Sequence, residues 1–273
     1  IGGYYARHDG EPDSIATAIA AHYCPQGPAD DVPQTPTAKA VALADKIDTL
    51  VGFFGIGAKP TGSKDPFALR RAALGVIRII LDGKLSVPLQ KLLDKAAENY
   101  GFAAVDNDVL PFIRDRLRVY LRDHNMRHDI VAAVLADAGG DDLRRMADET
   151  RSLAEFLENG DGLGLIAGWR RVSSMLAAEE KKAKHAFAAT TDPALFNDIE
   201  HALHRALTGL PDSDAGFAAQ LAALGDLRAP IDRFFDGIVV NDDDPAVRLN
   251  RLGLLAMIRE KMQLVADFTK IEG

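Results

Sequence analysis

The sequence contains a single cysteine, Cys24, and no uninterrupted apolar run of about 18 residues. One cysteine cannot form a disulfide within the chain, which excludes a disulfide-stabilised fold and is typical of proteins in a reducing compartment. The lack of long apolar runs argues against a membrane-spanning helix, and no cationic leader precedes an apolar segment near the start. We therefore expect a cytoplasmic protein without a membrane partner.

Positive charge is also in short supply. The chain has 32 Lys and Arg residues against 40 Asp and Glu, a net charge of -8. This balance argues against sequence-independent coating of DNA. Two stretches depart from it, because residues 112–128 and 169–185 each hold five Lys or Arg against two acidic residues, a net +3. A phosphate-bearing partner would have to contact a local patch such as these.

The alternation of apolar and polar residues that is typical of strands is nearly absent, and only residues 237–240 suggest a short extended piece. Instead, apolar residues recur at intervals of three and four, which predicts helices. The segments with this pattern are 40–53, 67–81, 89–97, 110–121, 130–135 and 249–268. Asp-Pro pairs at Asp65, Asp192 and Asp244 are typical helix starts. The sequence therefore predicts an all-α protein.

Glycine and polar residues between 99 and 108 interrupt two helical patterns, which predicts a domain boundary near residue 105. We expect one helical module over residues 1–105 and a second over residues 106–273. A proline-rich loop at residues 24–36 joins two helices of the first module and is too short to separate domains.

Two glycine-containing motifs approach known nucleotide-binding patterns without completing them. Residues 57–64 read GAKPTGSK, in which the final Ser-Lys order reverses that of a P-loop, and no strand pattern precedes them. We interpret this segment as a tight loop before the next helix, whose Lys64 is placed to contact an RNA phosphate. Residues 162–168 read GLGLIAG, with the third glycine one residue late for a dinucleotide fingerprint. We interpret them as a loop leading to Trp169.

The histidines give no complete metal site. His124 and His128 are four residues apart and His201 and His204 three apart, so either pair can share a helix face. The glutamate that zinc proteases place next to the first histidine is replaced by Asn125. We interpret these residues as surface histidines and assign no metal ligand. We also assign no catalytic residue, since no Gly-x-Ser-x-Gly motif is present.

The first basic stretch has the pattern of an RNA-binding helix. Arg114, Arg118 and Arg122 recur every four residues and form a stripe next to an apolar one. The apolar stripe consists of Leu110, Ile113, Leu117 and Leu121. Such a helix buries one face and offers guanidinium groups to phosphates. In the second stretch, Trp169 precedes Arg170 and Arg171. Its ring offers a plane on which an unpaired base can stack, next to two cations. The alternatives are a solvated arginine face and a tryptophan that belongs at least in part to the core.

Three segments, in order, carry a resemblance to a known family. They are GYYARHDGE at residues 3–11, residues 41–81 with the run KDPFALRR, and residues 234–270 with the runs FFDG, DPAVRLNRL and VADF. The sequences of these segments resemble the beta subunit of bacterial heterotetrameric glycyl-tRNA synthetase. The chain begins with Ile1 and not with Met, and it opens in the middle of a motif of this family, so we expect the C-terminal portion of a longer polypeptide.

The resemblance implies an HD-like helical domain over residues 1–105 and a DALR-type anticodon-binding bundle over residues 106–273. The DALR signature is loosened here to Asp-Pro-Ala-Val-Arg at residues 244–248, and Arg251 next to it is a further candidate RNA contact. In the HD-like module, Asp45 or Asp48 falls where a last metal-ligating aspartate would lie. No complete His, His-Asp and Asp set accompanies it, which leaves a metal-dependent HD phosphohydrolase as a weak alternative.

The function that the resemblance implies is a part of glycine–tRNA ligase, an aminoacyl-tRNA synthetase of protein biosynthesis. The alpha subunit of that family holds the class II site that uses ATP and Mg, and the beta subunit grips tRNA, including its anticodon. This fragment has no class II motif, so we expect no cofactor and no catalysis from it alone. The implied partners are glycine tRNA, the alpha subunit and a second beta subunit, and not DNA. The alternative is a non-catalytic helical protein-interaction module.

Overall fold

The computed structural model describes residues 1–27, 29–136, 140–211 and 213–272. Every regular element among these residues is a helix, and the β-type pairing found there is an isolated bridge between Thr61 and Lys64. The prediction of an all-α protein is therefore confirmed. None of the described helices is both long enough and apolar enough to cross a membrane.

The chain folds into two compact units. Unit 1 comprises residues 1–131 and the described residues of 137–148, and unit 2 comprises residues 132–136 and the described residues from 149 onward. Unit 1 contains α1 (Gly2–His8), α2 (Asp13–Ala21), α3 (Pro36–Gly55), α4 (Leu69–Asp82), α5 (Leu89–Asn99) and α6 (Val109–Asp123). The helices α7 (His128–Val134) and α8 (Leu143–Glu158) contribute residues to both units. Unit 2 contains α9 (Gly160–Ala183), η1 (Pro193–Leu195), α10 (Asp198–Thr208), η2 (Ser213–Ala215), α11 (Phe217–Asp226), α12 (Arg228–Gly237), α13 (Pro245–Gln263) and η3 (Phe268–Lys270).

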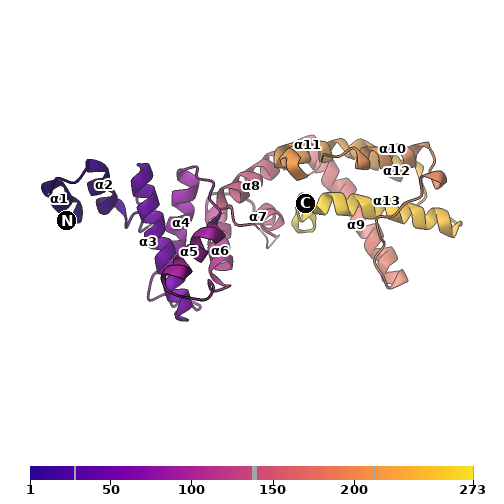
Figure 1. Ribbon diagram of the computed structural model, residues 1–273. Coiled ribbons are helices and arrows are strands. Elements are labelled where there is room, and N and C mark those ends of the chain that lie inside the picture. The colour runs from indigo at the N-terminus through magenta and orange to yellow at the C-terminus, as the bar shows by residue number, and fades with distance from the viewer. Residues whose placement is uncertain (28, 137–139, 212, 273) are drawn as a thin grey trace. The chain divides into compact units, whose positions relative to one another are not determined.

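The core of unit 1 forms around α4, which packs against both α3 and α6 (Figure 1). The α4 side chains of Val76, Ile77, Ile79 and Ile80 are completely buried. The neighbouring Gly75 leaves room for the methylene chain of Lys46 on α3: a Cβ at Gly75 would lie 2.7 Å from Cδ of that lysine. Burial of apolar side chains therefore holds α3 and α4 together. Because Gly75 has no side chain, the side chain of Lys46 can pass between the two helices.

The segment between α5 and α6 is fastened to α3. The stacked rings of Tyr100 and Phe102, with centroids 5.3 Å apart, lie over Gly52 and Gly55 of α3, where a Cβ would collide with them. Further along, Lys59 forms ion pairs of 2.8 Å with two aspartates, Asp106 and Asp108. The helix α6 belongs to unit 1, and the change of unit comes between residues 131 and 149, later in the chain than the boundary predicted near residue 105.

Two Asp-Pro pairs start helices in different ways. Asp244 accepts a hydrogen bond from the backbone N–H two residues later, with Pro245 at the first position of α13, as the sequence predicts. Asp65 acts from further away, because its carboxylate accepts hydrogen bonds of 2.8 and 2.9 Å from the backbone N–H groups of Leu69 and Arg70. The helix α4 therefore begins at Leu69, and its first donors are already satisfied.

In unit 2, α13 is the most deeply buried helix and packs against α9 and α10 (Figure 1). Five consecutive residues, 252–256, are buried, so this part of α13 is covered on all sides. Gly253 is among them because the backbone carbonyl of Thr190 occupies the place of a side chain. Residues 238–240 link α12 to α13 and form no strand, contrary to the sequence suggestion.

The glycines at 162–168 lie within α9 and not in a loop, which corrects the interpretation made from the sequence. Two of them let α12 approach, because a Cβ at Gly164 would collide with the side chain of Arg228 and a Cβ at Gly168 would lie 3.1 Å from that of Ile231. Small residues on a helix face allow such close packing without breaking the helix. The spacing that resembles a dinucleotide fingerprint is therefore a helix-packing pattern.

Candidate nucleic-acid interface

The outer face of α9 carries exposed cations. Arg170, Arg171 and Lys181 are exposed, as are Ser174 and Ala178 between them. These positions share one side of the helix because residues three, four, seven and eleven apart lie close together around the helix axis. The other side is buried and includes Leu165, Trp169, Val172 and Leu176. The helix thus buries one face and presents a row of positive charge on the other.

Both acidic residues of this basic stretch are neutralised by cations around them. Glu179 is 2% exposed and forms ion pairs with Lys182, at 2.7 Å, and with Arg248. The hydrogen bond from Lys182 lowers the pKa of Glu179, burial opposes that shift, and the bond from Arg248 adds to it. Burial would raise the pKa of Glu180, but the hydrogen bonds from Arg259, at 2.7 Å, and from the backbone N–H of Phe187, together with the nearby positive charge, leave the pKa lowered. Neither carboxylate therefore cancels the charge of the exposed arginines.

The two arginines of the α9 face have different surroundings. The guanidinium of Arg171 lies over the ring of Phe235, 4.4 Å from its centroid, and forms no ion pair within the described part of the chain. Arg170 donates a long hydrogen bond of 3.4 Å to the backbone carbonyl of Ile271. A stacked guanidinium keeps its N–H groups available for phosphate oxygens. Both side chains can therefore bind an anion.

Trp169 and Arg251 belong to unit 2 and were predicted to contact RNA, but both side chains are buried or nearly buried. The side chain of Trp169 is 3% exposed, so its ring is part of the core and offers no plane to a base in this structure. Arg251 forms ion pairs of 2.6 Å with Glu200 and Asp242, and its side chain is 11% exposed. These two residues therefore stabilise unit 2 and are not surface contacts.

The arginine stripe predicted for α6 turns from the core to the surface of unit 1. Arg114 is buried and donates a hydrogen bond to the carbonyl of Gly140, Arg118 is half-buried, and Arg122 is exposed. A four-residue step rotates about 40° beyond one full turn of the helix, so a stripe with this period drifts around the axis. The sequence pattern placed all three on one face, and the structure leaves Arg122 as the exposed member.

The loop before α4 places Lys64 at the surface of unit 1. Thr61 and Lys64 exchange backbone hydrogen bonds of 2.8 and 3.0 Å, which closes a turn around Gly62, whose φ is 50°. Arg70 donates to the carbonyl of Gly62 at 2.6 Å and holds the turn against α4. Because Asp65 already accepts from the first N–H groups of α4, the start of this helix is not an open phosphate site.

The predicted contacts therefore divide between the units. Lys64, Arg118 and Arg122 lie in unit 1 with α6, while Arg170 and Arg171 lie in unit 2. Sequence reasoning missed Lys181, although its distance of eleven residues from Arg170 places it on the same helix face.

The histidine pairs have structural surroundings. His124 lies 2.7 Å through Nδ1 from the carbonyl of Tyr120, and the rings of His201 and His204 both contact the ring of Phe196. Within residues 1–27, 29–136, 140–211 and 213–272, no three His, Cys, Asp or Glu side chains are grouped closely enough to hold a metal ion.

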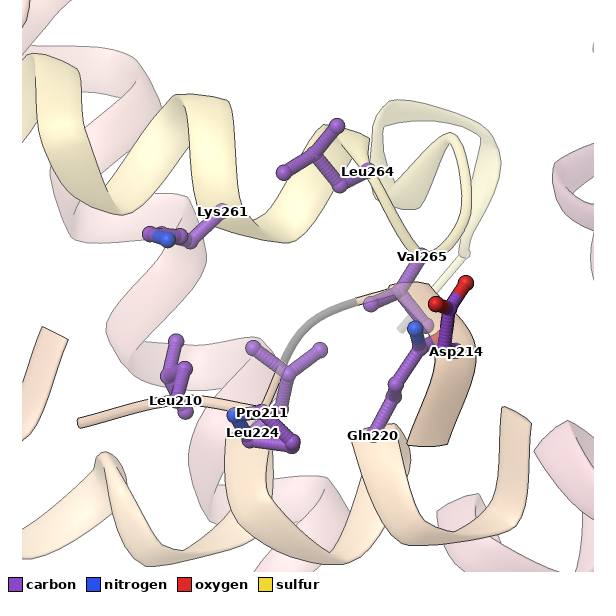
Figure 2. A pocket seen from close by; sticks show the side chains of 8 residues that line it. All are labelled: Leu210, Pro211, Asp214, Gln220, Leu224, Lys261, Leu264 and Val265. Carbon is purple, nitrogen blue, oxygen red and sulfur yellow. The ribbon is translucent and has the colours of Figure 1, made fainter. Parts of the chain in front are cut away.

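Unit 2 also has a hollow at the C-terminal end of α13. It has a volume of about 430 Å³, and Figure 2 shows side chains of α13 and of the segment that follows it opposite those of residues 210–224. Most of its lining is apolar: Leu210, Pro211, Leu224, Leu264 and Val265. The polar members are Asp214, Gln220 and Lys261. This hollow is suited to an apolar side chain of a partner.

Comparison with known proteins identifies the family. A family model described as glycyl-tRNA synthetase beta subunit matches residues 1–136. Over 282 residues the chain is 45% identical to the glycine–tRNA ligase beta subunit of Ruegeria sp. (strain TM1040), and over 281 residues it is 46% identical to that of Phenylobacterium zucineum (strain HLK1). The chain belongs to the glycyl-tRNA synthetase beta subunit family. The resemblance inferred from the sequence motifs is thereby confirmed.

The two relatives extend the match over both units. Each alignment covers 100% of this chain and 40% of the relative, so the chain spans about two fifths of the length of these beta subunits. The family model ends at residue 136, shortly after the last residue of α7, and so covers α1 to α6 of unit 1. Unit 2 is matched by the two relatives.

Proposed function

We propose that this chain is the tRNA-binding portion of a glycyl-tRNA synthetase beta subunit. In this role it holds glycine tRNA, including its anticodon, while an alpha subunit uses ATP and Mg to ligate glycine. The chain supplies no catalytic residue or cofactor to that reaction. Its partners are the tRNA, the alpha subunit and a second beta subunit, in the cytoplasm. Family membership supports this proposal, since both relatives are named as beta subunits of this ligase.

The observation that carries the proposal is the cationic face of α9. Arg170, Arg171 and Lys181 are exposed on it, and the acidic residues of the same stretch are engaged with Lys182, Arg248 and Arg259. In a chain with net charge -8, a phosphate backbone needs such a local concentration of positive charge. Arginine suits this task because its planar fork pairs with phosphate oxygens.

The test is a salt titration of tRNA binding by the 273-residue chain carrying Arg170→Glu and Arg171→Glu. Each lost phosphate contact lowers the slope of log affinity against log salt by about one, so we expect a slope smaller by about two and much weaker binding to glycine tRNA. The circular dichroism spectrum and the melting temperature remain near those of the wild type because both side chains are exposed.

A matched control carries Arg205→Glu and Arg233→Glu, the same change of charge at exposed residues of α10 and α12. This control keeps most of the affinity and most of the salt slope. Equal losses in the two double variants would mean that net charge, and not the α9 face, sets binding. Wild-type binding by the α9 variant would overturn the proposal for this face.

A second candidate function, a protein-interaction module, is favoured by the apolar hollow of Figure 2 and by Leu264, which is 76% exposed beside it. Its partner would be the alpha subunit. Replacement of Leu264 by Glu should then weaken co-purification with the alpha subunit and leave tRNA binding unchanged. If the chain binds no tRNA but its capture of the alpha subunit depends on Leu264, this candidate replaces the first.

A further inference from the structure

Unit 1 contains a cavity that none of the predicted contacts uses. Its volume is about 330 Å³, within the range of small-molecule sites. It lies where α3, the start of α4 and the loop after α2 meet, and residues from all three segments line it. The aromatic, amide and charged side chains of the lining are Tyr23, Gln26, Asp45, Lys46, Phe67 and Arg71.

Two of these side chains are aromatic rings held in place by a second ring. Phe67 stacks on Phe53 with centroids 4.1 Å apart and planes at 21°, and it remains 45% exposed. Tyr23 lies 3.8 Å from the ring of His22 and remains 60% exposed. Exposed rings fixed in this way are stacking platforms for a planar ligand, because their orientation is already set before binding.

The backbone next to Phe67 supports a role in binding. Ala68, which also lines the cavity, has φ of 55°, a left-handed conformation that is unfavourable for a residue with a Cβ. The two hydrogen bonds from the start of α4 to Asp65 span this residue and hold it there. Such a conformation persists where the surrounding structure enforces it, and here it sets the position of Phe67 at the mouth of the cavity.

The cavity also contains a buried ammonium group. Lys46 is 5% exposed, and its Nζ donates to the backbone carbonyls of His22 and Tyr23 at 3.3 and 3.1 Å. An ammonium has three N–H donors, so these two bonds leave one for a ligand. The adjacent Asp45 accepts no hydrogen bond through its carboxylate from the described residues, and the side-chain amide of Gln26 is likewise available. Donors and acceptors therefore lie side by side.

Arg71 supplies the remaining charge. It is exposed and forms no ion pair within the part of the chain that the structure describes. With Lys46 and Arg71 against Asp45, the charged residues of the lining sum to +1. A ligand that matches this set has a planar ring, an edge with donors and acceptors, and one anionic group. A nucleotide has all three, whereas an inorganic anion or an apolar molecule would leave most of these groups unused.

We propose that this cavity binds one unpaired nucleotide, with the base against Phe67 and Tyr23, its edge toward Asp45 and Lys46, and its phosphate on Arg71. The proposal rests on the proposed function only for the source of the nucleotide, which is either an unpaired position of a bound tRNA or a free mononucleotide. If the nucleotide belongs to an RNA, the cavity adds a contact in unit 1 to the α9 face in unit 2.

The experiment compares three probes by calorimetry and saturation-transfer NMR: the four nucleoside 5′-monophosphates, a short unstructured oligoribonucleotide and glycine tRNA. Stacking of one base contributes about 1–3 kcal/mol, so Phe67→Ala should weaken binding about 5- to 150-fold for each probe that uses the cavity. Arg71→Gln should weaken it at least about fivefold and lower the salt slope by about one. Tyr4→Ala and Lys91→Gln, at an exposed ring and an exposed cation elsewhere in unit 1, serve as matched controls.

Each outcome decides the proposal. Mononucleotide binding that Phe67→Ala and Arg71→Gln weaken supports a free nucleotide as ligand, and losses seen with the oligoribonucleotide or tRNA alone support an RNA strand. If neither variant changes the binding of any probe more than its control does, or if no probe binds, the proposal is overturned. Arg71→Gln changes an exposed side chain, so its result stands even if Phe67→Ala fails to fold. If the α9 variant alone loses tRNA, the proposed function is supported independently of this cavity.

Discussion

The two units differ in what their inward-facing Lys and Arg side chains bind. In unit 1, Lys46 donates to the backbone carbonyls of His22 and Tyr23, and Arg78 donates to those of Gly27 and Asp30 at 2.8 and 2.7 Å. In unit 2, the cations of α13 bind carboxylates: Arg251 pairs with Glu200, Arg259 with Glu180 and Arg248 with Glu179. One unit therefore uses cations to hold a loop, and the other uses them to join helices.

This difference has consequences for stability. A carbonyl oxygen does not titrate, so a cation bound to it holds its loop at any pH at which the cation is charged. A carboxylate loses its charge in acid, and a buried carboxylate without its cation is costly. We therefore expect unit 2 to be more sensitive to pH and to the loss of a single charge. The only tryptophan, Trp169, is buried in unit 2, so its fluorescence follows that unit selectively.

The largest effect is expected for Arg251→Ala in unit 2. The substitution leaves Glu200, which is 1% exposed, as a buried charge without a cation, although the backbone N–H of Asn197 still donates to it. Removing one partner of a buried ion pair costs about 3–5 kcal/mol. Urea unfolding followed by Trp169 fluorescence measures it. A double variant with Leu at both 251 and 200 should regain most of the loss, because no charge then remains buried. A loss below about 1 kcal/mol in Arg251→Ala would remove the contrast between the units.

An intermediate effect is expected for Lys46→Met in unit 1. Methionine fills the space beside Gly75, but the carbonyls of His22 and Tyr23 lose their donor, which costs about 1–3 kcal/mol. Hydrogen exchange of α3 and α4 measures the loss, and the Trp169 transition serves as the control because it reports unit 2. The loss should be the same at pH 5 and pH 7. A loss that changes between these values would contradict the assignment of a carbonyl-bound cation.

The smallest effect is expected for Glu179→Gln, and it concerns pH dependence. The pKa of Glu179 is lowered in the folded chain, so its contribution to stability is complete above the unfolded pKa of about 4.3 and is lost as pH falls through the folded value. The variant should therefore lose up to about 1 kcal/mol at pH 7 and almost nothing at pH 3, with a flatter slope between them. Urea midpoints by Trp169 fluorescence test this, and parallel slopes would refute it.

The six segments that the sequence predicted as helical each coincide with a helix, because their signals are local. The span of α5 and the start of α13 at Asp244-Pro245 follow from apolar periodicity and from a capping side chain, both of which act within a few residues. The attachment of the segment around residue 105 could not be predicted, for the opposite reason. The polar composition around residue 105 is that of a linker, and its attachment to α3 depends on glycines about fifty positions earlier in the chain.

The candidate interface could be predicted in part. Arg170 and Arg171 lie exposed, as an RNA contact requires, whereas Arg114 is buried because a four-residue spacing drifts around a helix. Trp169 could not be assigned from its neighbours, since the same sequence suits a stacking plane and a core residue, and only the packing of α9 distinguishes them. The cavity of unit 1 combines residues from three segments, so no local pattern in the sequence predicts it.

The two glycines of α3 that receive Tyr100 and Phe102 have a consequence for how this family can diverge. At Gly55 any side chain would occupy the place of the Phe102 ring, and at Gly52 a methyl group would lie 2.7 Å from the hydroxyl of Tyr100. Neither glycine can gain a side chain unless its aromatic partner moves or is replaced. Each glycine and its ring thus form a pair whose members must change together, and homologues with alanine at position 55 should carry a smaller residue at position 102.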